Sequence, residues 1–239
     1  MVTVLIPAYN EAERIAGTIA AVRALAVDEG LEVIVIDDGS GDDTARIADA
    51  AGADVVIRQT NGGKGAALTA GAAIASGKVL LLLDADIGAT ATESTKLLGP
   101  ILGGEADMTI AMFPVHSGRG GGAGLVVRLA RWGIYRLTGR TMNAPLSGQR
   151  ALTRETLERS GGFATGWGVE ISLTVRALQS DCRVIEVDTT MDHRVTGRSL
   201  SAVLHRASQF RDAAFVLFRL WRTHVKVGSS GNSGHSVND

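Results

Sequence analysis

The chain has 239 residues, a formal net charge of −1 and a hydrophobic content of 45%. This composition excludes a disordered chain, and the near-zero net charge gives no indication of a nucleic-acid partner. No run of about 20 apolar residues is present, so the sequence predicts no membrane-spanning helix. Cys182 is the only cysteine, which excludes an internal disulfide framework and favours a cytoplasmic protein.

The first half of the chain alternates short apolar runs with helical patterns. The expected strands are Val2–Ile6, Val33–Ile36, Asp54–Ile57 and Val79–Leu83. Helices are expected from Asn10 or Glu11 to about Leu25, after a cap at Asp42 or Asp43, and from the turn at 61–65 to about Ala75. Because this alternation builds parallel sheets with right-handed crossovers, we expect an α/β fold with a mostly parallel sheet flanked by helices.

Acidic or glycine-rich segments follow three of the expected strands. They are Pro7–Glu11, Asp37–Ser40 and Asp84–Asp86. Ligands of open α/β sheets bind beyond the carboxyl ends of the strands. Two carboxylates two residues apart repel each other unless a cation lies between them, so Asp84 and Asp86 favour a divalent metal that carries a diphosphate. Lys64, in a glycine turn at a helix start, adds a positive charge suited to an anion.

The second half of the chain contains fewer clear strands and more glycine. Strands are expected at Met108–Phe113 and Arg183–Val187, and helices at Leu125–Leu137 and from Gly168 to about Leu178. The glycine-rich segment 116–124 is either a connector or a lid that orders over a substrate, and we favour the lid. Apolar residues at helical spacing over Leu200–Trp221 predict a C-terminal amphipathic helix with a basic flank.

Four motifs occur in a characteristic order. They are Pro7-Ala8-Tyr9-Asn10-Glu11, Asp37-Asp38-Gly39-Ser40, Lys64-Gly65 and Asp84-Ala85-Asp86. With them, residues 2–200 resemble the GT-A-fold glycosyltransferases of family 2 and relatives, both dolichyl-phosphate-mannose-synthase-like and glucosyl-3-phosphoglycerate-synthase-like. The resemblance implies a Rossmann-like GT-A domain over 1–227, with a nucleotide-sugar half (1–112), an acceptor half (113–227) and a disordered tail (228–239).

The resemblance also implies the roles of individual residues. Asp86 would ligate Mg²⁺ or Mn²⁺, and His193 would complete the coordination shell, because Asp192-His193-Arg194 resembles the glucosyl-3-phosphoglycerate synthase group. The implied donor-binding residues are Pro7, Ala8, Tyr9, Glu11, Asp38, Lys64, Asp84, Ala85 and Asp86. The expected acceptor-binding residues are Ser147, Gly148, Gln149, Arg150 and Arg194.

Glu170 is the second expected catalytic residue beside Asp86. Many inverting relatives carry a Glu-Asp pair here, whose Asp is the general base. This chain has Val169-Glu170-Ile171 without an Asp. The resemblance therefore implies contact of Glu170 with the transferred sugar, and it favours retention of the anomeric configuration.

The sequence leaves open the acceptor and the surface that the C-terminal helix contacts. We expect a hexosyltransferase acting from a UDP-glucose-type or GDP-mannose-type donor on a small or lipid-linked acceptor. Phosphoglycerate is in doubt, because the position near Gly124 lacks the basic residue of phosphoglycerate-using relatives. The C-terminal helix would pack on the sheet, form a homodimer or contact the inner membrane face as a polyprenyl-phosphate glycosyltransferase would.

Two other classes compete with a glycosyltransferase. A sugar nucleotidyltransferase would carry a basic glycine-rich loop after the first strand, where this chain has the acidic segment Pro7–Glu11. A non-catalytic sugar-nucleotide-binding protein would carry the same motifs without turnover. Neither the dinucleotide motif nor the phosphate-loop motif follows the first strand, so an ordinary dehydrogenase or ATPase is not expected.

Overall fold

The structure is a computed structural model that describes residues 1–28, 30–114, 123–164 and 168–191. The predicted C-terminal helix and tail, His193, Arg194 and most of segment 116–124 lie outside these residues. Within the described part, no helix is long and apolar enough to cross a bilayer.

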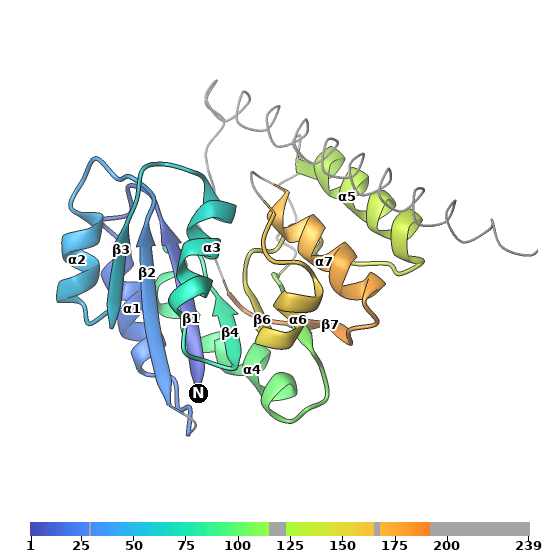
Figure 1. The fold of residues 1–239 in the computed structure, drawn as a ribbon, viewed down its shortest axis with the longest axis horizontal. Helices are drawn as coiled ribbons and strands as arrows, with labels where there is room; N and C mark the ends of the chain where they lie inside the picture. The colour runs from blue at the N-terminus through green and yellow to red at the C-terminus, as the bar shows by residue number, and fades with distance from the viewer. Residues whose placement is uncertain (29, 115–122, 165–167, 192–239) are drawn as a thin grey trace, which may run out of the picture.

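The described strands form one seven-stranded sheet in the order β3-β2-β1-β4-β6-β5-β7 (Figure 1). They are β1 (Val2–Ala8), β2 (Leu31–Asp37), β3 (Val55–Arg58), β4 (Val79–Leu82), β5 (Met108–Met112), β6 (Arg150–Thr153) and β7 (Val184–Asp188). Only β6 runs antiparallel to its neighbours β4 and β5 within this sheet. The expectation of a mostly parallel α/β sheet is confirmed.

Helices cover both faces of the sheet. They are α1 (Ile15–Arg23), α2 (Thr44–Ala50), α3 (Lys64–Ile74), the 3₁₀ helix η1 (Gly88–Glu93), α4 (Ser94–Leu102), α5 (Ala123–Thr138), α6 (Arg154–Arg159) and α7 (Val169–Gln179). Side chains alternate along each strand, so Leu5 belongs to the buried cluster that contains residues of α3, α5 and α7, while Val4 and Ile6 belong to the cluster with residues of α1 and α4. Because the central strands are buried on both faces, nearly every residue in them is apolar.

Helix α1 begins at Ile15, later than the Asn10 or Glu11 start expected from the sequence. Asn10 has a left-handed φ of 56°, which interrupts a helix. Its N–H donates to Ser40 Oγ (2.9 Å), and its Oδ1 accepts from Gly41 N–H (2.8 Å). Asn10 therefore joins the loop after β1 to the loop after β2.

Strand β6 and helix α6 were not expected from the sequence. The strand has four residues, begins with a charged arginine and shows no alternating pattern. Thr153 ends the strand and caps α6 by accepting a hydrogen bond from Thr156 N–H (3.1 Å). Strand pairing with β4 and β5 decides this element, and no local property of four residues could predict it.

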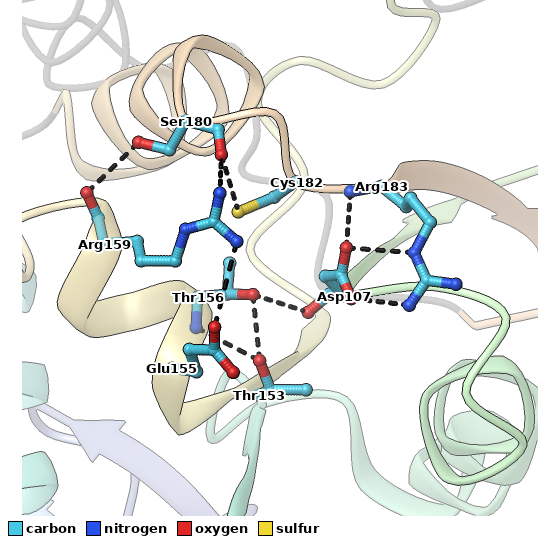
Figure 2. A network of polar contacts seen from close by, with 8 residues as sticks. All are labelled: Asp107, Thr153, Glu155, Thr156, Arg159, Ser180, Cys182 and Arg183. Atoms are coloured by element: carbon cyan, nitrogen blue, oxygen red, sulfur yellow. Dashed lines mark hydrogen bonds and ion pairs between the residues drawn. The ribbon is translucent and has the colours of Figure 1, made fainter.

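A polar network fastens the amino ends of β5 and β7 (Figure 2). Arg183 donates to both Asp107 carboxylate oxygens, from Nε to Oδ2 (3.1 Å) and from Nη2 to Oδ1 (2.7 Å). Thr156 Oγ1 donates to the carbonyl of Asp107 (3.2 Å), which brings α6 into the same network. This edge of the sheet is stabilised by internal contacts, whereas the motifs of the sequence lie at the opposite edge.

Candidate active site

The candidate site lies at the carboxyl edge of the sheet, where β1, β2 and β4 end beside one another. The sheet register pairs Ala8 with Asp37 and Leu5 with Leu82. The loops that follow these strands therefore leave the sheet at a common edge. Helix α3 begins here with Lys64, and α7 places Glu170 in its first turn.

Lys64 forms an ion pair with a carboxylate from each half of the chain. Its Nζ lies 2.7 Å from Asp84 Oδ1 and 3.0 Å from Glu170 Oε1. The three side chains are 25%, 34% and 14% exposed, respectively. Burial disfavours the ammonium, but the charges of Asp84 and Glu170 outweigh this effect and raise the pKa of Lys64 above its ordinary value. The Lys64 ammonium thus joins Asp84, after β4, to Glu170 in the second half of the chain.

Gln149 holds the same aspartate from the other side. Its Oε1 accepts from the backbone N–H of Asp84 (2.9 Å), and its Nε2 donates to Asp84 Oδ2 (2.8 Å). Gln149 is 1% exposed, so these bonds are shielded from water. Each Asp84 oxygen consequently has a fixed donor, which fixes the orientation of the carboxylate.

Gly148 allows the backbone to approach this ion pair closely. A Cβ at position 148 would lie 2.8 Å from Asp84 Oδ2 and would also collide with Lys64 Nζ. Any side chain here would therefore displace one partner of the pair. The sequence assigned Gly148 and Gln149 to the acceptor, whereas in the structure they pack against Asp84 and Lys64.

Arg150 differs from the expectation that it meets an acceptor. It is fully buried, and its guanidinium donates to the carbonyl of Ser147 (2.8 Å), to Thr174 Oγ1 (2.8 Å) and to the carbonyl of Glu170 (3.1 Å). Burial lowers the pKa of Arg150 to about 10, so it stays charged at neutral pH. The buried guanidinium cannot reach an acceptor directly, and instead it fastens the segment before β6 to the first turn of α7.

Ser147 provides a polar atom with no assigned partner. The residue is 6% exposed, and its Oγ is buried without a hydrogen-bond partner in the described part of the chain. A buried hydroxyl without a partner is costly unless a ligand or water satisfies it. Because this oxygen is buried, as the Arg150 guanidinium is, a substrate would contact it only after the segment before β6 moves.

Asp38 shapes the turn from which α3 starts. The residue is 5% exposed, and its carboxylate accepts from Gln59 Nε2 (2.7 Å), Gly62 N–H (2.9 Å) and Gly63 N–H (2.8 Å). These bonds hold the turn that places Lys64 at the start of α3. Donor binding by Asp38 stays a prediction.

Thr18, on helix α1, forms hydrogen bonds with the backbone of the segment that contains Asp84 and Asp86. The sequence did not predict this contact. The buried Thr18 Oγ1 donates to the carbonyl of Ala85 (2.7 Å) and accepts from Gly88 N–H (2.9 Å). The available signal was a threonine on the apolar face that also carries Ile15 and Val22. A polar residue on such a face requires a hydrogen-bond partner.

The remaining predicted donor residues lie at the same edge. Ala8 and Ala85 are buried, Tyr9 is exposed, and Pro7, Glu11 and Asp86 are partly exposed. Glu11 forms a salt bridge with Arg14 (3.6 Å).

The oxygen ligands present fit a hard divalent cation. Asp84 and Asp86 supply carboxylates, the ligands that Mg²⁺ uses together with substrate phosphates and water. Among the described residues, no group of three or more His, Cys, Asp or Glu side chains could hold a metal ion. Lys64 and Gln149 hold Asp84, and direct ligation by Asp86 stays a prediction from the resemblance. The predicted ligand His193 lies outside the described residues.

The chain matches the model of one protein family and is similar to named proteins. The model of "Glycosyl transferase family 2" matches residues 3–165. Glycosyltransferase AglJ of Haloferax volcanii is 33% identical over 234 residues, which cover 92% of this chain and 71% of AglJ. Glucosyl-3-phosphoglycerate synthase of Mycolicibacterium paratuberculosis is 36% identical over 197 residues, which cover 73% of this chain and 59% of the synthase.

Solved structures of glucosyl-3-phosphoglycerate synthase from Mycobacterium tuberculosis share the fold. The complex with Mg²⁺ and uridine-diphosphate has a TM-score of 0.76 and 29% identity. The complex with Mn²⁺, uridine-diphosphate-glucose and phosphoglyceric acid has a TM-score of 0.75 and 30% identity. Each similarity covers 92% of this chain and 79% of the solved chain.

Replacing Lys64 with methionine should destabilise the protein in a pH-dependent way. Without the ammonium, the Asp84 and Glu170 carboxylates face each other with no cation between them. The free energy of unfolding should fall by about 1–3 kcal/mol at pH 7, a figure reduced for their partial exposure. This loss should shrink as the pH rises above about 10.4, because the wild type then loses the stabilisation that comes from the raised pKa of Lys64.

Chemical denaturation at several pH values measures this difference. In the wild type, the stabilisation from the raised Lys64 pKa is complete below the unfolded value of about 10.4 and is lost only as the pH rises through the folded value. Lys96→Met is the matched control, because the Lys96–Glu93 pair (2.6 Å) has a 47% exposed lysine. An equal and pH-independent loss in both variants would contradict the role of Lys64.

Proposed function

This chain belongs to glycosyl transferase family 2, and from this premise we propose that it transfers a hexosyl group from a UDP-glucose-type donor with Mg²⁺ or Mn²⁺ bound at Asp86. The donor class is supported by the solved synthase structures, which hold uridine-diphosphate-glucose and Mn²⁺. A sugar nucleotidyltransferase is not favoured, because the relatives are named glycosyltransferases and synthases.

The observation that carries this proposal is the ion pair of Lys64 with both Asp84 and Glu170. One ammonium and two carboxylates give the cluster a net charge of −1. A bound divalent metal would offset the carboxylates, and the donor diphosphate would offset the ammonium. Lys64 can then turn toward a phosphate or base oxygen, and Glu170 becomes available to the hydroxyls of the transferred sugar.

The residues divide the work of binding and catalysis. Asp86 is the proposed metal ligand, with His193 as the second ligand from the chain. Asp84, held by Gln149 and Lys64, is the proposed partner of the ribose hydroxyls. A bound divalent cation would stabilise the charge that develops on the diphosphate leaving group.

The acceptor would enter from the second half of the chain. We propose a single domain over 1–227, with donor binding in 1–112 and acceptor binding in 113–227. The buried Ser147 hydroxyl is the proposed polar contact for the acceptor or the transferred sugar. The acceptor itself is either a small molecule or a lipid-linked alcohol or phosphate, and a screen of both classes with labelled donor distinguishes them.

Asp86→Asn should lower turnover of UDP-glucose to UDP by roughly 100-fold or more, because charge stabilisation of the leaving group is lost. Turnover of the wild type in Mn²⁺ should likewise stop in EDTA. Asp49→Asn, an exposed aspartate on α2, is the control and should retain full activity. Activity that survives both the substitution and chelation would refute a metal at Asp86.

Gln149→Leu should weaken UDP binding in Mn²⁺ by about 10–100-fold, since residues that orient a ligand-binding carboxylate have effects of this size. Gln149→Glu should weaken it as well, and more at pH 8 than at pH 5, because a second carboxylate then faces Asp84 Oδ2. Titration calorimetry measures both affinities. Equal affinities at the two pH values in the Gln149→Glu variant would show that Gln149 only fills space.

The product should retain the anomeric configuration of the donor. Glu170 has no neighbouring Asp to act as the base of an inverting displacement, and it already pairs with Lys64 (3.0 Å). Proton NMR of the anomeric signal in the first product formed decides the outcome. An inverted linkage would return Glu170 to the role of general base.

A further inference from the structure

Helix α5 has two faces of different character. Val126, Ala130, Ile134 and Leu137 are buried and belong to the core that α5 shares with α7. Figure 1 shows α5 on the outer side of α7, away from the sheet. One apolar face is enough to pack a surface helix on a domain, so the opposite face should be polar.

The opposite face instead carries large apolar side chains. Leu125, Trp132 and Tyr135 are 60%, 62% and 55% exposed, and these values are the highest for large hydrophobic residues in the described part of the chain. Their spacings of seven and three residues place them on one side of the helix. Exposed apolar residues that gather on one surface mark an interaction site.

Basic residues lie among these apolar side chains. Arg128 and Arg136 are exposed on the same side, and neither forms a hydrogen bond or ion pair with a residue that the structure describes. The sequence from 123 to 140 contains no aspartate or glutamate. We call this surface, made by Leu125, Arg128, Trp132, Tyr135 and Arg136, the outer face of α5.

We propose that the outer face of α5 binds the surface of an anionic lipid bilayer. Tryptophan and tyrosine are suited to the headgroup region, where one part of the ring is apolar and the other is wet. Arginines beside them are attracted by anionic lipids. The proposal goes beyond the proposed transfer reaction and does not depend on it.

Charge argues against two other occupants of this face. A second copy docked through the same surface would bring Arg128 and Arg136 toward basic residues of the same kind. The segment predicted to form the C-terminal helix, 200–226, also carries five basic residues and only Asp212 as an acid. An anionic bilayer complements the charge of the face, whereas both protein partners would bring further basic residues to it.

Helix α5 is tied to the chain that follows it. Arg131 Nη2 donates to the carbonyl of Asn143, in the connection between α5 and β6 (2.5 Å).

The test is flotation of the full chain with lipid vesicles. The chain should bind vesicles that contain phosphatidylglycerol and should not bind vesicles of phosphatidylcholine alone. Arg128→Gln combined with Arg136→Gln should weaken this binding by roughly 30-fold, because each arginine near the surface contributes separately. Trp132→Ser combined with Tyr135→Ser should weaken it as well, which separates apolar insertion from charge attraction.

The controls are Arg46→Gln on α2 and Ile74→Ala on α3, which remove an exposed basic and an exposed apolar residue elsewhere. Both should bind like the wild type, and circular dichroism checks that every variant is folded. A Trp167→Phe/Trp221→Phe chain leaves Trp132 as the only tryptophan, and brominated lipids should quench its fluorescence.

Several outcomes would overturn the proposal. No binding to phosphatidylglycerol vesicles would show that the chain does not bind anionic lipid. Binding that is unchanged in both α5 double variants would show that another surface binds it. Light scattering that shows a dimer lost on Trp132→Ser, without vesicle binding, would assign the face to a second copy. UDP release from UDP-glucose in the same variants reports on the transfer reaction separately.

Discussion

The candidate site depends on one cation shared between two carboxylates. Lys64 starts α3, and it pairs with Asp84 after β4 and with Glu170 at the start of α7. Two partly buried carboxylates would otherwise repel each other here. The shared ammonium makes the contact between these segments attractive, at the ends of the strands where the sequence motifs lie.

The surrounding residues keep the members of this cluster in place. Asp38 shapes the glycine turn from which α3 starts, Gln149 fixes the orientation of Asp84, and Arg150 binds the carbonyl of Glu170. None of the three needs to touch a substrate to affect the reaction. Because each is almost completely buried, its hydrogen bonds are protected from water and hold their partners firmly.

The antiparallel strand β6 is the fold element that makes this arrangement possible. Its insertion between β4 and β5 brings Arg150 opposite Leu82, at the carboxyl edge of the parallel strands. The residues just before β6 therefore lie beside the end of β4, and Asp84 follows β4 by two residues. A parallel strand in this place would start at the far edge, and Gln149 could not reach Asp84.

The sequence by itself determined the class of fold and the location of the site. Apolar runs ending in acidic or glycine-rich segments identified β1, β2 and β4, and these short-range patterns reflect burial on both faces of a parallel sheet. Gly39 is an example of such a local constraint, since its φ of 83° lies in the left-handed region that favours glycine. The motifs also identified the family to which the chain belongs.

Only the tertiary structure decided which of these residues meet. Lys64, Asp84, Gln149 and Glu170 come from four separate segments, and no local pattern states that the lysine pairs with both acids or that the glutamine clamps one of them. Arg150 looked like an acceptor residue because it is charged, and its complete burial assigns it to positioning instead. Long-range pairing and burial depend on strand order, which β6 sets and which a four-residue segment cannot encode on its own.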